Sequence, residues 1–120
     1  MNEWQIGAIE SRFADIIWKN EPIASGLLAK KGEEVLGWKK STTYTVLKRL
    51  CDKGLFVNEG GTVSARVSRE DFYSTRSEKF VEETFGGSLP AFLTAFTTNK
   101  RLSAEEIAQL KQIVDRYEEG

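Results

Sequence analysis

Apolar residues recur at three- and four-residue steps near the start of the chain. Between residues 4 and 19 the positions with this spacing are Ile6, Ile9, Phe13, Ile16 and Ile17, and charged residues lie between them. This spacing predicts an amphipathic helix over residues 4–19. The helix is expected to end before Pro22, because proline disfavours helical geometry in the residue that precedes it.

A second, shorter helix is expected at residues 24–34, with Leu27 and Leu28 buried. Gly26 and Gly32 weaken it, because glycine loses more backbone entropy in a helix than other residues do. Residues 35–38 are expected to form a short extended bridge, in which Trp38 contributes to the core.

The third helix is predicted from about residue 40 to Gly54, where glycine supplies a left-handed cap and Lys53 complements the helix dipole. Its apolar stripe consists of Thr43, Val46, Leu47, Leu50 and Cys51. The remaining surface is polar and basic.

Two short β-rich runs follow, "LFVN" and "TVSARV", separated by Gly60 and Gly61. They predict a hairpin in which Leu55 and Val57 alternate against Val63, Ala65 and Val67. Three helices followed by a hairpin is the order of a winged helix-turn-helix, a fold that places its last helix before the wing in the DNA major groove. The fold class is therefore mainly α with a small β-hairpin wing.

The second half of the chain predicts three more helices. Ser68 and Asp71 resemble a capping box that opens a helix ending near Phe85, and the glycine pair at 86–87 allows a hinge. "LPAFLTAF" at 89–96 has helical apolar spacing, and "SAEE" at 103–106 is a second capping box.

The apolar stripes of these helices need a surface to bury against. Either they fold back on the winged domain, or they pair with the same helices of a second chain, and the narrow heptad-like seam of the last helix favours a dimer. We expect residues 1–68 to form the DNA-binding domain and residues 69–120 to form a helical dimerisation region. The residues expected at the dimer interface are Phe80, Leu89, Phe92, Leu93, Phe96, Ile107, Leu110, Val114 and Tyr117.

The amino-acid composition argues against several kinds of functional site. The chain has one cysteine and no histidine, which argues against a zinc site, a disulfide and histidine-based acid-base catalysis. Cys51 is interpreted as a small buried hydrophobe rather than a reactive thiol. We therefore expect no enzyme, no metal and no cofactor. With no long apolar run and no signal-like N-terminus, the chain is expected to be cytoplasmic, without membrane insertion.

Net charge hides a basic cluster. The chain carries −1 overall, whereas five basic residues and one acid, Asp52, lie within fifteen residues of the third helix region: Lys39, Lys40, Lys48, Arg49 and Lys53. Alone, such a run is usually a solvated helix face. Its position before a wing gives it a context for binding DNA.

The chain resembles the penicillinase repressor family over nearly its whole length. The matching segments are "FADIIWKNEPI" (13–23), "GWKKSTTYTVLKRLCDKGL" (37–55), "VSREDF" (67–72), "FVEETFGGSLPAFLTAF" (80–96) and "LSAEEIAQLKQI" (102–113). The resemblance implies a cytoplasmic homodimeric repressor whose winged helix reads an inverted-repeat operator.

The resemblance, together with the early lysine beside it, gives the expected DNA-binding set. These residues are Lys39, Lys40, Ser41, Thr42, Tyr44, Thr45 and Lys48. The lysines and the helix N-terminus suit phosphates, whereas Thr42, Tyr44 and Thr45 are placed for base edges. Two further residues of this helix each have two alternative roles. Thr43 either packs inside or contacts DNA, and Arg49 pairs either with an internal acid or with a phosphate.

Three departures from the family pattern change what the resemblance implies. The wing tip reads "EGGTV", without the basic residue that family wings commonly carry, so a wing contact to phosphate is in question. The cysteine-rich metal site of copper-responsive relatives is missing. In antibiotic-responsive members a membrane sensor triggers cleavage at an Asn-Phe bond, and Ala95-Phe96 stands there, so Phe96 is interpreted as structural, although a sensor or protease acting on this region is kept as a partner.

Two other function classes are alternatives to a repressor. A winged helix can serve as a protein-interaction module without sequence-specific DNA binding. An enzyme is disfavoured because adjacent acids such as Glu82 and Glu83 project to different helix faces.

Overall fold

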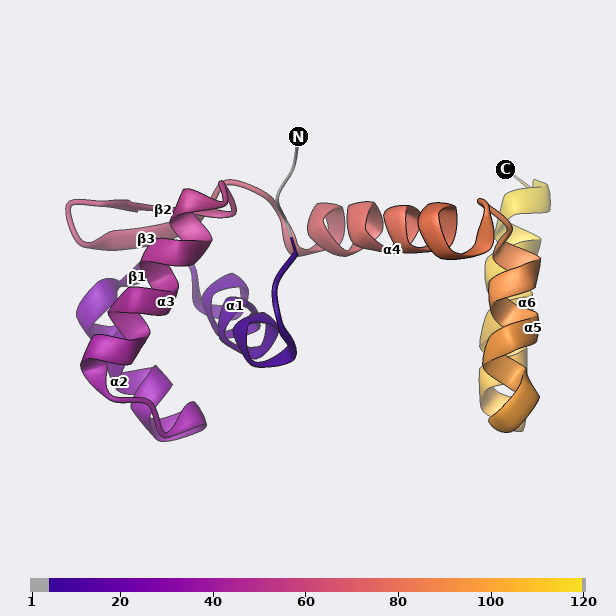
Figure 1. Cartoon of the computed structure of the whole chain (residues 1–120), viewed down its shortest axis with the longest axis horizontal. Coiled ribbons are helices and arrows are strands. Elements are labelled where there is room, and N and C mark those ends of the chain that lie inside the picture. The colour runs from indigo at the N-terminus through magenta and orange to yellow at the C-terminus, as the bar shows by residue number, and fades with distance from the viewer. Residues whose placement is uncertain (1–4, 120) are drawn as a thin grey trace. The chain divides into compact units, whose positions relative to one another are not determined.

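A computed structural model of the chain describes residues 5–119 (Figure 1). Its contacts divide the chain into two compact units, one ending at Ser77 and the other beginning at Glu78. The fold is mainly helical with one small antiparallel sheet, as the sequence predicts.

Helix α1 spans Ala8–Asn20, and Gly7 is its N-cap residue. Residue 4, the start of the predicted helix, lies outside the described residues. The prediction was wrong for Ile6, which is buried but precedes the helix, and for Ile9, which is half exposed. Packing of the segment before the helix, rather than helical periodicity, therefore buries Ile6.

Helix α2 spans Ser25–Leu36, so the extended bridge predicted after residue 34 was wrong at its first two positions. Leu28 is fully buried, but Leu27 is 51% exposed, so only one of the two leucines faces the core. Gly37 ends the helix with φ 69°, and its N–H donates to the Glu33 carbonyl at 3.0 Å. This left-handed glycine cap turns the chain directly toward the next helix.

Helix α3 spans Lys40–Asp52 and confirms the third predicted helix. Gly54, with φ 82°, follows it as expected. The predicted stripe is buried at Thr43, Val46, Leu47 and Leu50 and half-buried at Cys51.

Helices α2 and α3 approach closely at Gly32. A Cβ atom at this position would lie 2.6 Å from the Thr43 side-chain oxygen, which is shorter than real Cβ contacts allow. Gly32 is itself buried. The residue that weakens α2 by propensity is thus the one that lets α3 pack against it.

Three strands form the sheet, in the order β1-β3-β2: β1 (Ile23–Ala24), β2 (Phe56–Glu59) and β3 (Thr62–Ala65). The predicted hairpin is confirmed, and its two-residue turn places Gly60 and Gly61 at φ 59° and 92°, as a twisted hairpin requires. The predicted inward positions are confirmed at Leu55 and in the second strand, where Val63 is buried and Ala65 and Val67 pack on the core. In the first strand the alternation was wrong, because Phe56 is buried and Val57 only half-buried. Strand β1 was not predicted, because two residues carry no alternation to detect.

The core of the first unit lies between α1, α2, α3 and the sheet. Trp18 connects it to the start of α4 (Arg69–Phe85), with ring centroids 5.1 Å from Phe56 and 5.3 Å from Phe72. Trp38 packs on Phe13 at 5.1 Å, which confirms it as a core residue. The largest fully buried apolar side chains are Phe13, Ile17, Leu28, Leu50, Leu55, Phe56, Val63 and Phe72.

The first turns of α4 are held to the first unit by polar contacts. Ser68 Oγ accepts a hydrogen bond from the Asp71 N–H at 3.1 Å, which confirms the predicted start of the helix. Arg69 Nε donates to Asp15 Oδ1 at 2.9 Å, and Trp18 Nε1 donates to the Val67 carbonyl at 2.9 Å. The bond from Arg69 connects α4 to α1, and the bond from Trp18 connects α1 to the segment just before α4.

The second unit contains the end of α4, then α5 (Leu89–Asn99) and α6 (Ala104–Glu119). Within it, α5 and α6 lie side by side (Figure 1). Ser88 Oγ caps α5 by accepting from the Ala91 N–H at 3.1 Å. The predicted capping box of α6 is confirmed in both directions, since Ser103 and Glu106 exchange hydrogen bonds of 3.0 and 3.1 Å. These bonds lower the pKa of Glu106.

Candidate nucleic-acid interface

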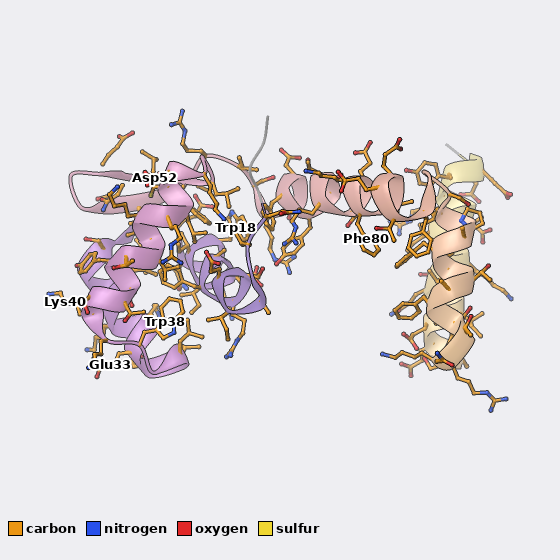
Figure 2. All side chains as sticks on the ribbon, in the orientation of Figure 1. Trp18, Glu33, Trp38, Lys40, Asp52 and Phe80 are labelled. Carbon is orange, nitrogen blue, oxygen red and sulfur yellow. The ribbon has the colours of Figure 1, made fainter. Side chains whose placement is uncertain are left out.

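The N-terminus of α3 is open and positively charged. Lys39 occupies the N-cap position, and no side chain caps the helix. Lys39, Lys40, Ser41 and Thr42 are all exposed, and Figure 2 labels Lys40 at this end of the helix. Uncapped N–H groups at the positive end of a helix dipole attract anions, and the two ammonium groups add to that field.

The outer face of α3 continues with Thr45, Lys48 and Arg49, which are exposed. Thr45 Oγ1 donates its hydrogen bond to the Ser41 carbonyl at 2.9 Å. Since the hydroxyl proton is used within the helix, the side chain offers only a methyl group and an acceptor lone pair to an outside partner.

Tyr44 and Thr43 differ from this outer face. Tyr44 is half-buried against the core, and Lys40 Nζ lies 5.9 Å from its ring centroid. Thr43 is fully buried, and its Oγ1 has no hydrogen-bond partner among the described residues. Thr43 is therefore a packing residue, whereas six of the seven predicted DNA-binding residues are exposed and the seventh, Tyr44, is half-buried.

Two cations on the outer face of α3, Lys48 and Arg49, differ in their ion pairing. Lys48 Nζ lies 3.4 Å from Asp52 Oδ2, but both side chains are largely exposed, so this pair contributes little to stability. Arg49 makes no ion pair within the part of the chain that the structure describes. Of the two predicted roles of Arg49, the pairing with an internal acid is therefore not found there.

Sequence reasoning missed one cation, Arg66, which directly follows β3 and is exposed. It lines a groove of about 320 Å³ between α3 and the wing, together with Tyr44, Lys48 and Asn58. The signal was present in "TVSARV", because alternation that turns residues 63, 65 and 67 inward turns residue 66 outward.

Cys51 lines the same groove. Burial, and secondarily the Asp52 carboxylate, raises the pKa of its thiol. The thiol therefore stays protonated at neutral pH, which supports its interpretation as a small hydrophobe.

Residues 5–119 lack two other kinds of feature. Across residues 5–119, no three or more acidic or cysteine side chains gather as a metal ion would require. Within the same range, no helix has the length and apolarity to cross a membrane.

The predicted dimerisation residues lie in the second unit. Leu89, Ile107, Val114 and Tyr117 are exposed, the last by 86%. Phe92, Leu93 and Leu110 are half-buried in a groove of about 250 Å³ between α5 and α6. An aromatic series joins α4 to α5, with Phe92 centred 6.0 Å from both Phe80, labelled in Figure 2, and Phe96, each about half exposed.

The Ala95–Phe96 peptide bond lies inside α5. The Phe96 ring packs on Phe92, and Lys100 Nζ lies 5.7 Å from its centroid. Phe96 thus has packing partners that account for an aromatic residue at this position.

Comparison with known proteins identifies the fold's relatives. The penicillinase repressor family matches residues 6–116. The penicillinase repressor of Bacillus licheniformis is 29% identical over 117 residues, covering 94% of this chain and 91% of the relative. The methicillin resistance regulatory protein MecI of Staphylococcus aureus (strain N315) is 21% identical, covering 94% and 95%. The chain therefore belongs to the penicillinase repressor family, a family of transcriptional repressors.

Proposed function

We propose that this repressor acts as a homodimer that binds an inverted-repeat DNA operator by placing α3 in the major groove. The observation that carries the proposal is the outer face of α3, where exposed lysines and hydroxyl side chains surround an uncapped helix N-terminus. Family membership supplies the repressor role, and a winged helix uses this helix for base recognition.

Each residue of the face has a proposed role. Lys39, Lys40 and Lys48 bind backbone phosphates, because flexible ammonium groups suit point contacts to anions. Ser41, Thr42 and Thr45 contact base edges. Thr45, with its proton directed at Ser41, suits a thymine methyl group or a base amino group. Tyr44 contributes its hydroxyl at the edge of the face.

The proposed dimer interface is the apolar surface of α5 and α6. Neither helix has a buried residue, although both carry regular apolar stripes. Two copies that cover each other's stripes remove this surface from water and bring two copies of α3 to the two halves of a palindrome.

Release from DNA is proposed to involve the second unit, through a sensor or protease that acts on it. The packing of Phe96 supports a structural role for the Ala95–Phe96 segment. Methicillin resistance, which the Staphylococcus aureus relative is named for, is not part of the proposal for this chain. A repressor of this kind acts in the cytoplasm, where bacterial DNA lies.

The proposal is tested by selection of DNA fragments from the source genome with the purified protein, followed by sequencing. We expect an enriched motif with inverted-repeat symmetry. Affinity for that duplex should fall with salt with a log-log slope of about −0.9 for each phosphate neutralised. If no fragment is enriched over background, operator binding is wrong.

Two substitutions separate the proposed roles. Lys40→Ala should weaken binding to every duplex and reduce the salt slope by about 0.9. Thr45→Ser removes only a methyl group, so it should change preference among bases at fixed positions of the motif while the salt slope stays constant.

A protein-interaction module is the alternative. Light scattering with and without the selected duplex distinguishes this module from an operator-binding repressor. The repressor should gain mass when DNA is added, whereas the interaction module should not.

A further inference from the structure

The groove between α3 and the wing brings together cations from two elements distant in the sequence. Lys48 comes from the outer shoulder of α3, and Arg66 comes from the end of β3. Tyr44 and Asn58 add hydrogen-bonding groups to the same walls. The groove therefore has a basic rim that neither element has alone.

The floor of the groove is apolar. Leu47, Phe56 and Val57 line it. A sugar–phosphate segment of DNA matches both parts, because its phosphate is anionic and its deoxyribose carries C–H groups. A small free anion would use the rim but gain nothing from the floor.

The location of the groove also favours a backbone. A recognition helix in the major groove lies between two phosphate strands, and its two shoulders face them. Tyr44 and Lys48, four residues apart, form the shoulder of α3 that faces the wing, beside the outward-facing Thr45.

One carboxylate opposes this arrangement. Asp52 Oδ2 lies 3.4 Å from Lys48 Nζ, one helical turn along the exposed face, and Figure 2 labels it at the C-terminal end of α3. An anion that approaches Lys48 is repelled by Asp52 and must compete with it. Asp52 is thus placed to lower the affinity of the groove for phosphate.

We propose that the groove between α3 and the wing binds a backbone phosphate of duplex DNA, with Arg66 as the wing's cation and Asp52 as a built-in restraint on Lys48. This inference rests on the proposed function. The wing tip, with Glu59 and Thr62, lacks a basic residue for a phosphate contact. The wing therefore contacts DNA through Arg66 at its stem instead of through its tip.

The test measures salt dependence of operator binding for Arg66→Gln and Arg66→Lys, with Arg101→Gln as the control for an exposed arginine in the second unit. Arg66→Gln should weaken binding to all duplexes and reduce the salt slope by about 0.9, whereas Arg66→Lys keeps most of the slope. The control should match the parent protein. Thermal unfolding of each variant checks that the fold is unchanged.

Asp52→Asn tests the proposed restraint and should change DNA affinity in the opposite direction to Arg66→Gln. Removing its charge should raise affinity for every duplex by about twofold to fivefold, the range expected for an exposed ion pair. Glu78→Gln, an exposed acid on α4, is the control and should have no effect.

Three outcomes overturn the inference while leaving the proposed function intact. The first is operator binding by Arg66→Gln with the parent's slope. The second is a change in base preference without a change in slope, which indicates that Arg66 reads a groove rather than a phosphate. The third is lower affinity for Asp52→Asn, which indicates that Asp52 itself contacts a base. Failure to select any operator overturns the proposed function instead.

Discussion

The two units of this chain treat their apolar residues in opposite ways. In the first, large side chains such as Phe13, Leu28 and Phe72 are completely buried within one chain. In the second, α5 and α6 have regular apolar stripes but no buried residue, and Val114 and Tyr117 are exposed by 56% and 86%. Helical periodicity shows that a stripe must face something, but it does not say whether that surface belongs to the same chain.

The difference concerns how each unit is stabilised. The first unit closes its core with α1, α2, α3, the three-stranded sheet and the start of α4. The second has only the end of α4, α5 and α6, too few to cover a stripe on every helix. Its stability is therefore expected to depend on a second copy and hence on concentration.

The largest expected effect breaks the closed core. Phe13→Ala removes a fully buried ring that packs on Trp38, and should lower the free energy of unfolding by about 3–5 kcal/mol. Urea denaturation at two protein concentrations should give the same loss at both. Ile9→Ala, a half-exposed position on the same helix, is the control, and equal effects at the two positions would contradict a closed core.

The second-largest expected effect concerns the exposed apolar stripe of α6 in the second unit. Val114→Glu puts a charge on the exposed seam of α6 and should convert a dimer to monomers, which light scattering detects. Operator affinity should fall by about a hundredfold as one half-site is lost. Gln112→Glu adds the same charge on the polar face of the same helix and should remain dimeric. A Val114→Glu protein with the mass of the parent would show that the dimer uses another surface.

A third effect sharpens the packing within the first unit. Gly32→Ala places a methyl group 2.6 Å from Thr43 Oγ1. The clash should lower the free energy of unfolding by about 1–3 kcal/mol, and the higher helix propensity of alanine should offset about 1 kcal/mol of this loss. Thr43→Ala in the same chain should restore much of the loss, as a double-mutant cycle measures. Gly26→Ala, on the same helix with open space around it, should instead stabilise. Stability changes of the same sign for Gly26→Ala and Gly32→Ala would contradict the close approach of α2 and α3.

The smallest effect concerns the end of a helix in the second unit. Ser88→Ala removes the hydroxyl that caps α5 and should lower stability by about 1 kcal/mol, measured by circular dichroism during unfolding. Ser74→Ala, an exposed serine within α4, is the control. A loss at Ser88 as large as at Phe13 would indicate that α5 depends on its cap more than on its apolar contacts.

Much of the fold follows from local signals. The range of α3 was predicted almost to the residue, because its apolar spacing and Gly54 are both local. The ends of α4 and the capping box of α6 were also recovered, since Ser68, Ser103 and Glu106 act on backbone groups within four residues. The expected base-reading and phosphate-binding roles of α3 stay predictions.

The errors occurred where distant contacts override local pattern. Ile6 is buried outside any helix, and Leu27 is exposed within one. Strand β1 exists only because β3, forty residues later, offers it a partner. No local periodicity reports such pairings.

By itself, the sequence determined the order of the helices and the hairpin, the apolar stripes, the basic character of α3 and the family, because these depend on residue types at short spacing. Only the tertiary structure decided that Gly32 is a contact point with Thr43. It also showed that Tyr44 is half inside the core and that Arg66 lies across a groove from Lys48. These are contacts between separate helices and strands, and the physical reason is that packing joins surfaces whose positions no local spacing encodes.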